Sequence, residues 1–236
     1  MRLAVLTTQT LHHAYFVREL AKFWPIERVF VETRSAKAPF DTAHPFEVLR
    51  EVYESELWFE GADGALEDLA ETTVFDSLNS PSAIQELNDF RADVAVVFGT
   101  GKLSVDVIRT CPNGMVNLHG GDPEKYRGLD THLWAVYHRE FDELVTTLHY
   151  VNATLDDGDI IGREPINLLP GTKLHQLRQF NTKTCVKLVK DALVKFEKNG
   201  SFPVHPQIKS GRSYSFMPTV LKELCVNHFE RYTKNL

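Results

Sequence analysis

The sequence predicts an α/β fold with a doubly wound, mostly parallel, Rossmann-like sheet and a short C-terminal extension, and two observations carry this prediction. Short apolar runs alternate with segments of helical spacing over the first half of the chain. One of these runs, Val94–Phe98, is apolar at every position, as expected of a parallel strand that is covered on both faces. Sheets of this kind bind ligands at the carboxyl ends of their strands.

A β-α-β unit is expected at the N-terminus. Residues 3–6 form a short apolar run, residues 13–23 have large apolar side chains at helical spacing, and residues 26–31 are rich in β-branched and aromatic side chains. The following segment, residues 33–71, is more charged; a helix is expected over residues 46–59, and no function is assigned to the segment. The order of the elements favours parallel strands.

Further elements follow from helix caps and composition. Ser80 and Pro81 are typical of an N-cap and a first helical turn. Residues 144–151 are rich in strand-forming side chains. A long helix is expected to begin after Thr172 and to end at Gly200, because glycine commonly terminates helices.

The composition restricts the class of protein. With 236 residues, 43% hydrophobic and 25% charged, the chain has a globular composition and length for one sizeable core. Its three cysteines are odd in number and lack the spacing of metal ligands, which favours a reducing compartment. The absence of a long apolar stretch and the net charge of -6 disfavour membrane and nucleic-acid partners. We therefore expect a cytoplasmic protein without a metal.

The strand Met115–His119 becomes polar at its carboxyl end. Asn117 and His119 are two residues apart, so on an extended backbone they project from the same face. An amide beside an imidazole suits an oxygen on which negative charge develops, because both can donate hydrogen bonds to it. An isolated Asn-x-His is more commonly a turn cap beside a structural histidine. Gly120 and Gly121, which follow directly, would allow a ligand to approach the backbone closely.

Asp156 is the third candidate and lies in a loop after the strand expected at residues 144–151. Clusters of Asp and Gly are common in turns, and Asp157-Gly158 alone would indicate a tight turn. If Asp156 meets His119, its carboxylate would favour the charged imidazolium and could accept a proton.

These motifs resemble those of the folate-dependent formyltransferase family, most closely its nucleotide-sugar N-formyltransferases. The matching stretches, in order, are Asn117-Leu118-His119, Lys125-Tyr126-Arg127-Gly128 and Leu155-Asp156-Asp157-Gly158-Asp159. Each motif alone recurs by chance, whereas three in order are specific. The sequence departs from the family at Gly120-Gly121-Asp122-Pro123, because the family more often has a proline directly after the catalytic histidine.

The resemblance implies transfer of a formyl group from the co-substrate 10-formyltetrahydrofolate to a primary amine. It implies that Asn117, His119 and Asp156 are catalytic: Asn117 and His119 would stabilise the oxyanion, and Asp156 would manage protons. It also implies two folate-binding backbone segments, which consist of Thr100, Gly101, Lys102 and Leu103 and of Val151, Asn152, Ala153 and Thr154.

The expected acceptor is a nucleotide-linked amino sugar of polysaccharide biosynthesis. The segment after the first strand lacks the glycines that a glycinamide ribonucleotide enzyme uses to bind phosphate. The acidic chain, with about 35 residues after Gly200, disfavours methionyl-tRNA. An aminoacyl group on a carrier is a close alternative. Gln9, His12 and Arg127 are candidate acceptor contacts, Arg127 because a guanidinium suits phosphate.

Two functions of other classes compete with this interpretation. A metal-dependent hydrolase would use His119, Asp156 and Asp159 as ligands. A non-catalytic folate- or nucleotide-binding module would bind its ligand without turnover. Elemental analysis distinguishes the first from a formyltransferase, and a tetrahydrofolate-release assay distinguishes the second.

The resemblance also implies a division of the chain. We expect a formyltransferase catalytic domain over residues 1–200 and an extension over residues 201–236, composed of a turn-rich stretch and a helix over residues 219–232. The apolar stripe of this helix needs a surface to cover, so the extension is expected to serve assembly, for example as a homodimer, or the acceptor pocket.

Overall fold

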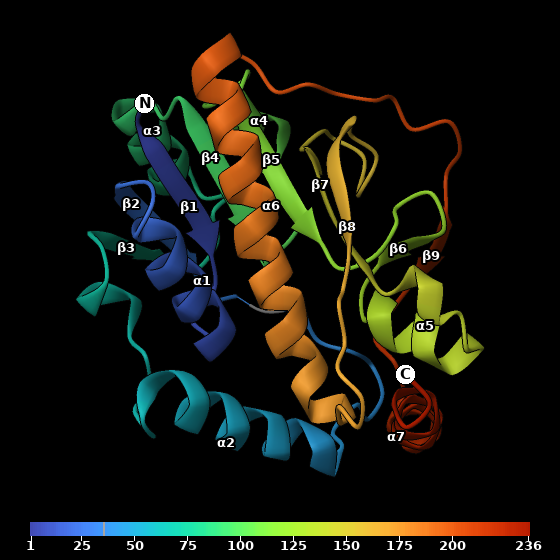
Figure 1. Cartoon of the computed structure of the whole chain (residues 1–236). Coiled ribbons are helices and arrows are strands. Elements are labelled where there is room, and N and C mark those ends of the chain that lie inside the picture. The colour runs from blue at the N-terminus through green and yellow to red at the C-terminus, as the bar shows by residue number, and fades with distance from the viewer. Residues whose placement is uncertain (35) are drawn as a thin grey trace.

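A seven-stranded sheet forms the centre of the computed structural model, which describes residues 1–34 and 36–236 (Figure 1). Its strands are β1 Leu3–Thr7, β2 Ile26–Glu32, β3 Thr72–Phe75, β4 Val94–Phe98, β5 Met115–His119, β7 Val145–Tyr150 and β8 Ile160–Pro165. They lie in the order β3-β2-β1-β4-β5-β7-β8. The strands from β3 to β5 are parallel, which confirms the mostly parallel α/β fold.

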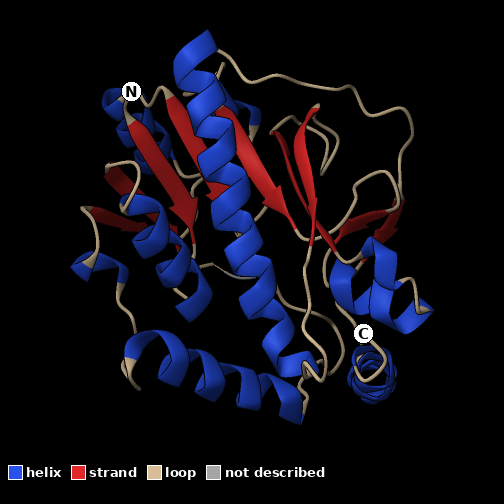
Figure 2. Cartoon of the chain, in the orientation of Figure 1, coloured by secondary structure: helices blue, strands red, loops and turns tan. Residues whose placement is uncertain are grey.

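Helices cover both faces of the sheet (Figure 2). They are α1 Leu11–Ala21, α2 Pro45–Phe59, α3 Pro81–Phe90, α4 Val105–Arg109, α5 Thr131–His138, α6 Leu177–Asn199 and α7 Thr219–Thr233, with 3-10 turns η1 Leu66–Asp68, η2 Phe141–Glu143 and η3 Leu174–Gln176. α1 and α6 pack on one face, around Phe16, Val96 and Val189, while α3 and α4 pack on the other, around Leu87 and Val107. Burial on both faces explains why β1 and β4 are apolar at nearly every position.

Local chemistry sets the helix ends. The Ser80 hydroxyl accepts a hydrogen bond from the Ala83 N–H at 3.2 Å, and Pro81 opens α3 as expected. α2 begins with a capping box in which the His44 N–H donates to Glu47 at 3.0 Å. α6 ends where Gly200 takes the left-handed conformation at φ 73°.

The sheet departs from the parallel expectation after β5. β7 pairs antiparallel with β5, and β8 pairs antiparallel with β7. The sequence analysis did not predict β8 or α5. β8 is the edge strand of the sheet and carries the polar residues Arg163 and Glu164, so it lacks the apolar pattern of a buried strand. The antiparallel addition has a consequence for the site, since it places β7 residues directly opposite those at the end of β5.

Residues 201–236 run back over the C-terminal half of the chain. β9 Arg212–Tyr214 pairs in parallel with β6 Tyr126–Gly128, which forms a separate two-stranded sheet. α7 lies beside α5 in Figure 1, and its Cys225 and Phe229 are fully buried in a core shared with α5 and the first turns of α2 and α6. The extension thus contacts several elements that surround the cleft described below. None of the helices in the described residues is long and apolar enough to cross a membrane.

Candidate active site

A cleft of about 570 Å³ opens at the carboxyl ends of β1, β4 and β5. The loops after β1, β4 and β7 contribute to its walls, as do the start of α5, one side of α2 and the first turns of α6. In Figure 1 the arrowheads of β1 and β5 both point toward the lower end of the molecule, where α2 also lies. This is where an open α/β sheet binds its ligands.

Asn117 and His149 face each other across the antiparallel pair β5–β7. The Asn117 Nδ2 lies 3.2 Å from the His149 Nε2, and the His149 Nδ1 lies 2.8 Å from the Tyr150 carbonyl oxygen. Because that carbonyl can only accept, Nδ1 carries the proton and Nε2 accepts from the Asn117 amide. One N–H of the amide is thereby committed to His149, and the second remains for a ligand in the cleft.

His119 lies buried beside this pair and is fixed through one ring nitrogen. Its Nε2 donates to the Tyr126 carbonyl oxygen at 2.7 Å, so in the neutral ring Nδ1 is the basic atom. Nδ1 lies 3.6 Å from Asp156 Oδ1. Burial lowers the pKa of His119, while the negative charge of Asp156 acts to raise it.

Asp156 has a left-handed backbone, with φ 51°. Its Oδ2 accepts from the Gly128 N–H at 2.8 Å, and its Oδ1 lies 3.6 Å from His119 Nδ1 and 3.7 Å from His149 Nε2. Burial raises the pKa of Asp156, but the proximity of His149 and His119 and the Gly128 N–H lower it to about 2. The carboxyl is therefore ionised at neutral pH.

The Lys-Tyr-Arg-Gly motif supports this cluster through its backbone. The Tyr126 carbonyl oxygen orients His119, and the Gly128 N–H holds Asp156. Gly128 has φ 91°, and a Cβ there would lie 2.2 Å from the Tyr214 carbonyl oxygen. Only glycine fits this position, because β9 approaches it so closely.

The structure brings together the two segments assigned to folate. Thr100, Gly101, Lys102 and Leu103 line the cleft, as do Val151, Asn152 and Thr154, whereas Ala153 does not. The Gly101 N–H donates to the buried Glu32 at 2.7 Å, and the Asn79 side chain binds the Lys102 carbonyl oxygen at 2.9 Å. These contacts give the first segment a fixed conformation.

Of the three candidate acceptor contacts, Gln9, His12 and Arg127, one lies in the cleft lining and two lie outside it. His12 lines the cleft. Gln9 points elsewhere, because its side chain binds the Gly64 carbonyl oxygen and the Leu66 N–H, both at 3.2 Å. Arg127 is buried outside the cleft lining, where it pairs with Asp157 at 2.8 Å and with the Ser210 hydroxyl.

Several lining residues were missed from the sequence. His149 could have been found as a polar residue in a strand, with the same two-residue alternation that singled out Asn117 and His119. Arg50 and Arg178 carry no local signal, since α2 and α6 bring them to the cleft from distant parts of the chain.

The ligand set of the competing hydrolase does not assemble. The described residues contain no group of three or more His, Cys, Asp or Glu side chains that could hold a metal ion. Asp159 is exposed and lies outside the cleft lining.

Comparisons with known proteins agree with the motifs. A family model described as formyl transferase matches residues 62–193. The methionyl-tRNA formyltransferase of Caldanaerobacter subterraneus subsp. tengcongensis is 25% identical over 147 residues, which cover 62% of this chain and 46% of that protein. The corresponding enzyme of Trichodesmium erythraeum is 29% identical over 139 residues, 58% of this chain and 40% of the enzyme. The chain thus spans less than half the length of these curated relatives.

Solved structures share the fold at lower identity. A sugar N-formyltransferase from Shewanella sp. FDAARGOS_354 has a TM-score of 0.62 at 12% identity, covering 97% of this chain and 87% of that one. The formyltransferase PseJ from Anoxybacillus kamchatkensis, in complex with UDP-4,6-dideoxy-4-formamido-L-AltNAc and tetrahydrofolate, has a TM-score of 0.52 at 19% identity, covering 90% and 85%. The phosphoribosylglycinamide formyltransferase of Streptococcus pneumoniae TIGR4 has a TM-score of 0.57 at 14% identity, covering 84% and 99%.

Proposed function

This chain belongs to the formyl transferase family, and we propose that it transfers the formyl group of 10-formyltetrahydrofolate to the amine of a nucleotide-linked amino sugar. The observation that carries the proposal is the cluster of Asn117, His119 and Asp156 in one cleft, between the two segments assigned to the folate. His149 completes the cluster through its contact with Asn117.

The cleft fits a folate because it combines exposed backbone with apolar side chains. The loop after β4 and the loop after β7, the two strands that flank β5 in the sheet, both border it, with Leu103 and Val151 among the apolar contacts. Rigid backbone N–H and C=O groups suit a flat heterocycle that carries donors and acceptors along its edge. The bound folate would supply the formyl group and leave as tetrahydrofolate.

Asn117 is placed to stabilise charge on the formyl oxygen. Its amide is held by His149 at 3.2 Å and keeps a second N–H for that oxygen. A donor that is oriented before the reaction loses little free energy in reorganisation, and this is the basis of an oxyanion hole.

Asp156 and His119 are placed to manage protons. Asp156 is ionised and can accept a proton from the attacking amine, directly or through water. His119 Nδ1 lies 3.6 Å away and can share that proton, because its other nitrogen is occupied by the Tyr126 carbonyl oxygen. The pair can therefore hold one proton between them while the amide bond forms.

Support for the sugar acceptor comes from the structures that share this fold, two of which act as sugar N-formyltransferases or bind a nucleotide-linked formamido sugar. The curated sequence relatives formylate methionyl-tRNA, which makes this RNA the second candidate acceptor. The net charge of -6 favours the smaller acceptor, because the acidic field opposes binding of an RNA backbone.

A panel of acceptors tests the proposal. UDP-, dTDP- and GDP-linked 4-amino sugars, glycinamide ribonucleotide and methionyl-tRNA are each incubated with 10-formyltetrahydrofolate, and the product mass is measured. The expected result is an N-formyl product from one of the amino sugars, with equimolar release of tetrahydrofolate. If only methionyl-tRNA or glycinamide ribonucleotide is formylated, the proposed acceptor is wrong. If ligands bind but no product forms, the proposed formyltransferase activity is wrong.

A further inference from the structure

The cleft has a second charged region, formed by helices rather than by strands. Arg50 of α2 and Arg178 of α6 both line it, together with His12, His13 and Phe46. Neither arginine is among the acceptor contacts expected from the sequence, and neither belongs to the family motifs. Two guanidinium groups at the wall of a ligand cleft call for an explanation, since a cation has no role in holding a neutral amine.

Arg178 is fixed by carboxylates that lie behind it. Its Nε lies 2.8 Å from Glu54 Oε1, and its Nη2 binds Glu54 Oε2 and, at 2.7 Å, Glu51 Oε1. The Glu54 side chain is fully buried, so this two-point ion pair sets the position of the guanidinium. Neither carboxylate belongs to the cleft lining.

Arg50 is less fully paired. It makes one long hydrogen bond, 3.4 Å to Glu51, and it lies 4.0 Å from Glu47. Its buried Nε has no hydrogen-bond partner among the described residues. Its positive charge is therefore only partly compensated by the protein.

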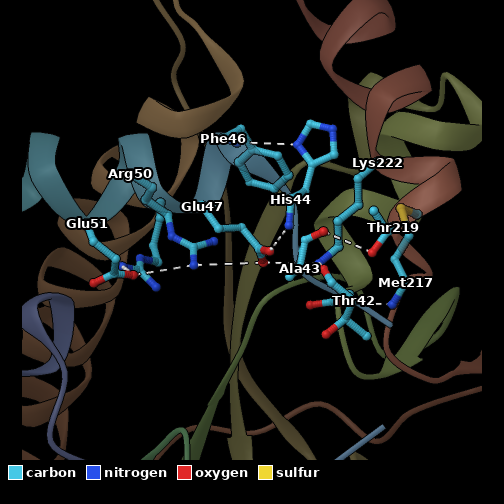
Figure 3. Close-up of polar contacts among 12 residues, drawn as sticks. Thr42, Ala43, His44, Phe46, Glu47, Arg50, Glu51, Met217, Thr219 and Lys222 are labelled. Atoms are coloured by element: carbon cyan, nitrogen blue, oxygen red, sulfur yellow. Dashed lines mark hydrogen bonds and ion pairs between the residues drawn. The ribbon is translucent and has the colours of Figure 1, made fainter. Parts of the chain in front are cut away.

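Glu47 is occupied by other groups, as Figure 3 shows. Its carboxylate accepts from the His44 N–H at 3.0 Å and pairs with Lys222 of α7 at 3.0 Å. Lys222 is almost fully buried and also donates to the Thr42 carbonyl oxygen. The C-terminal helix thus supplies a cation that lies closer to Glu47, at 3.0 Å, than Arg50 does, at 4.0 Å.

Two buried histidines, His12 and His13, line the same part of the cleft. Burial lowers the pKa of His13 to about 3, and the charge of Arg178 contributes to the shift. The pKa of His12 is lowered by burial, by His13 and by both arginines. Within the described lining, the carboxylates are Asp130, which accepts from the Met217 N–H at 2.8 Å, and Asp156 at the catalytic cluster. The side of the cleft formed by Arg50, Arg178, His12 and His13, here called the α2–α6 wall, thus presents two guanidinium groups to the cleft.

We propose that Arg50 and Arg178 bind the phosphate groups of the acceptor, so that a nucleotide-linked amino sugar extends from the catalytic cluster to the α2–α6 wall. This inference rests on the proposed function. It adds that two residues outside the family motifs recognise the nucleotide part of the substrate. The guanidinium fork of Arg50 matches phosphate geometry. Arg178 uses Nε and Nη2 to bind Glu54 and would donate to phosphate through Nη1. The carboxylates of the folate tail are also negatively charged and could bind the same arginines. The experiment must therefore distinguish acceptor phosphate from folate carboxylate.

Calorimetric titration of UDP and of inorganic pyrophosphate tests the subsite without any requirement for catalysis. Arg50→Gln should weaken both affinities about 10- to 100-fold, the scale for loss of charged hydrogen bonds. Arg178→Gln alone would leave Glu54 buried without its partner, so the second variant is the double change Glu54→Gln, Arg178→Gln, which keeps a neutral hydrogen bond. Arg109→Gln is the matched control, because Arg109 is exposed on α4 and its one ion pair among the described residues is with Asp106 at 3.5 Å.

The outcomes separate this inference from the proposed function. Weaker UDP and pyrophosphate binding in Arg50→Gln, with tetrahydrofolate affinity within about twofold of wild type, supports the subsite even if no amino sugar is formylated. Unchanged UDP and pyrophosphate affinities in both variants, or a wild-type protein that binds neither probe, overturns it even if formyl transfer is demonstrated. A loss confined to tetrahydrofolate affinity also overturns it, because the arginines would then serve the folate tail.

Discussion

The strand end and the helix end of the cleft are built in different ways. At the strand end, Asn117, His119 and His149 come from the adjacent strands β5 and β7, and two of their ring nitrogens are bound to backbone carbonyl oxygens. At the helix end, Arg50 and Arg178 reach in from α2 and α6 on long side chains that carboxylates hold from behind. Sheet register fixes the first group, while the second depends on how the helices pack.

This difference predicts a division of kinetic effects. Groups fixed by the sheet are suited to chemistry, because small errors in position are costly in a transition state. The two arginines lie at the wall of the cleft and not in the catalytic cluster, so they are suited to binding. We expect substitutions at the strand end to lower kcat and substitutions at the helix end to raise the KM for the acceptor.

The largest expected effect is that of Asp156→Asn. The amide cannot accept a proton from the amine, so kcat should fall on the order of 100- to 10000-fold while the fold is kept. Asparagine also tolerates the left-handed backbone of this position. Initial rates of tetrahydrofolate release measure the change.

Asp157→Asn is the matched control, because Asp157 is exposed and pairs with Arg127 outside the cleft lining. Its rate should stay within about threefold of wild type. If Asp157→Asn proved the more damaging of the two, the catalytic assignment would be wrong.

Asn117→Ala should lower kcat by roughly 100- to 1000-fold, the scale for removing one oxyanion donor. Folate binding should persist, because the folate segments lie on the loops after β4 and β7. Rate measurements and a tetrahydrofolate titration on the same preparation test both parts. Asn88→Ala, on the exposed face of α3, provides the control for loss of an asparagine. A rate within about threefold of wild type would exclude the oxyanion role.

The helix end should depend on α7. Lys222→Met removes the ion pair with Glu47 and the hydrogen bond to Thr42, and it should lower the free energy of unfolding by about 1–3 kcal/mol. Glu47, which already lies 4.0 Å from Arg50, would then have no competing cation and should pair with Arg50 more closely, so the acceptor KM should rise with kcat little changed. Urea unfolding and steady-state kinetics measure the two effects. Lys234→Met, near the C-terminus of α7, is the control, and a fall in kcat without any change in acceptor KM would contradict the division between the two ends.

The smallest expected effect is a pH dependence of stability that comes from His13. Its pKa is lowered from 6.5 to about 3 in the folded chain. Below about pH 6.5 the unfolded chain therefore binds a proton that the native chain does not, and stability falls as the pH falls. The contribution is about 1.4 kcal/mol per pH unit. Urea unfolding between about pH 7 and pH 5 should show a shallower slope in His13→Gln than in wild type, and equal slopes would refute the assignment.

Much of the fold could be predicted because its signals are local. Buried parallel strands are apolar throughout, and Ser80, Pro81 and Gly200 mark helix ends through chemistry that involves only near neighbours. The pairing of Asn117 with His119 followed from the two-residue alternation of a strand, whereas the convergence of Asp156 with them followed from family motifs. Their roles and the division at residue 200 remain predictions.

What the sequence could not provide depends on tertiary contacts. The cross-strand pairing of Asn117 with His149 requires the antiparallel register of β7, which no local sequence pattern predicts. The different placements of Arg127 and Arg50 also depend on tertiary contacts. Arg127 pairs closely with Asp157. Arg50 lies 4.0 Å from Glu47, whose carboxylate pairs more closely with Lys222, a residue distant in sequence.

The most direct test of the central claim is the mass of the product formed by wild type and by Asp156→Asn with 10-formyltetrahydrofolate and a UDP-linked 4-amino sugar. We expect an N-formyl sugar from wild type, equimolar with tetrahydrofolate, and a rate lower by at least about 100-fold from the variant. Equal product from both proteins, or formylation of methionyl-tRNA with no sugar product, would contradict it.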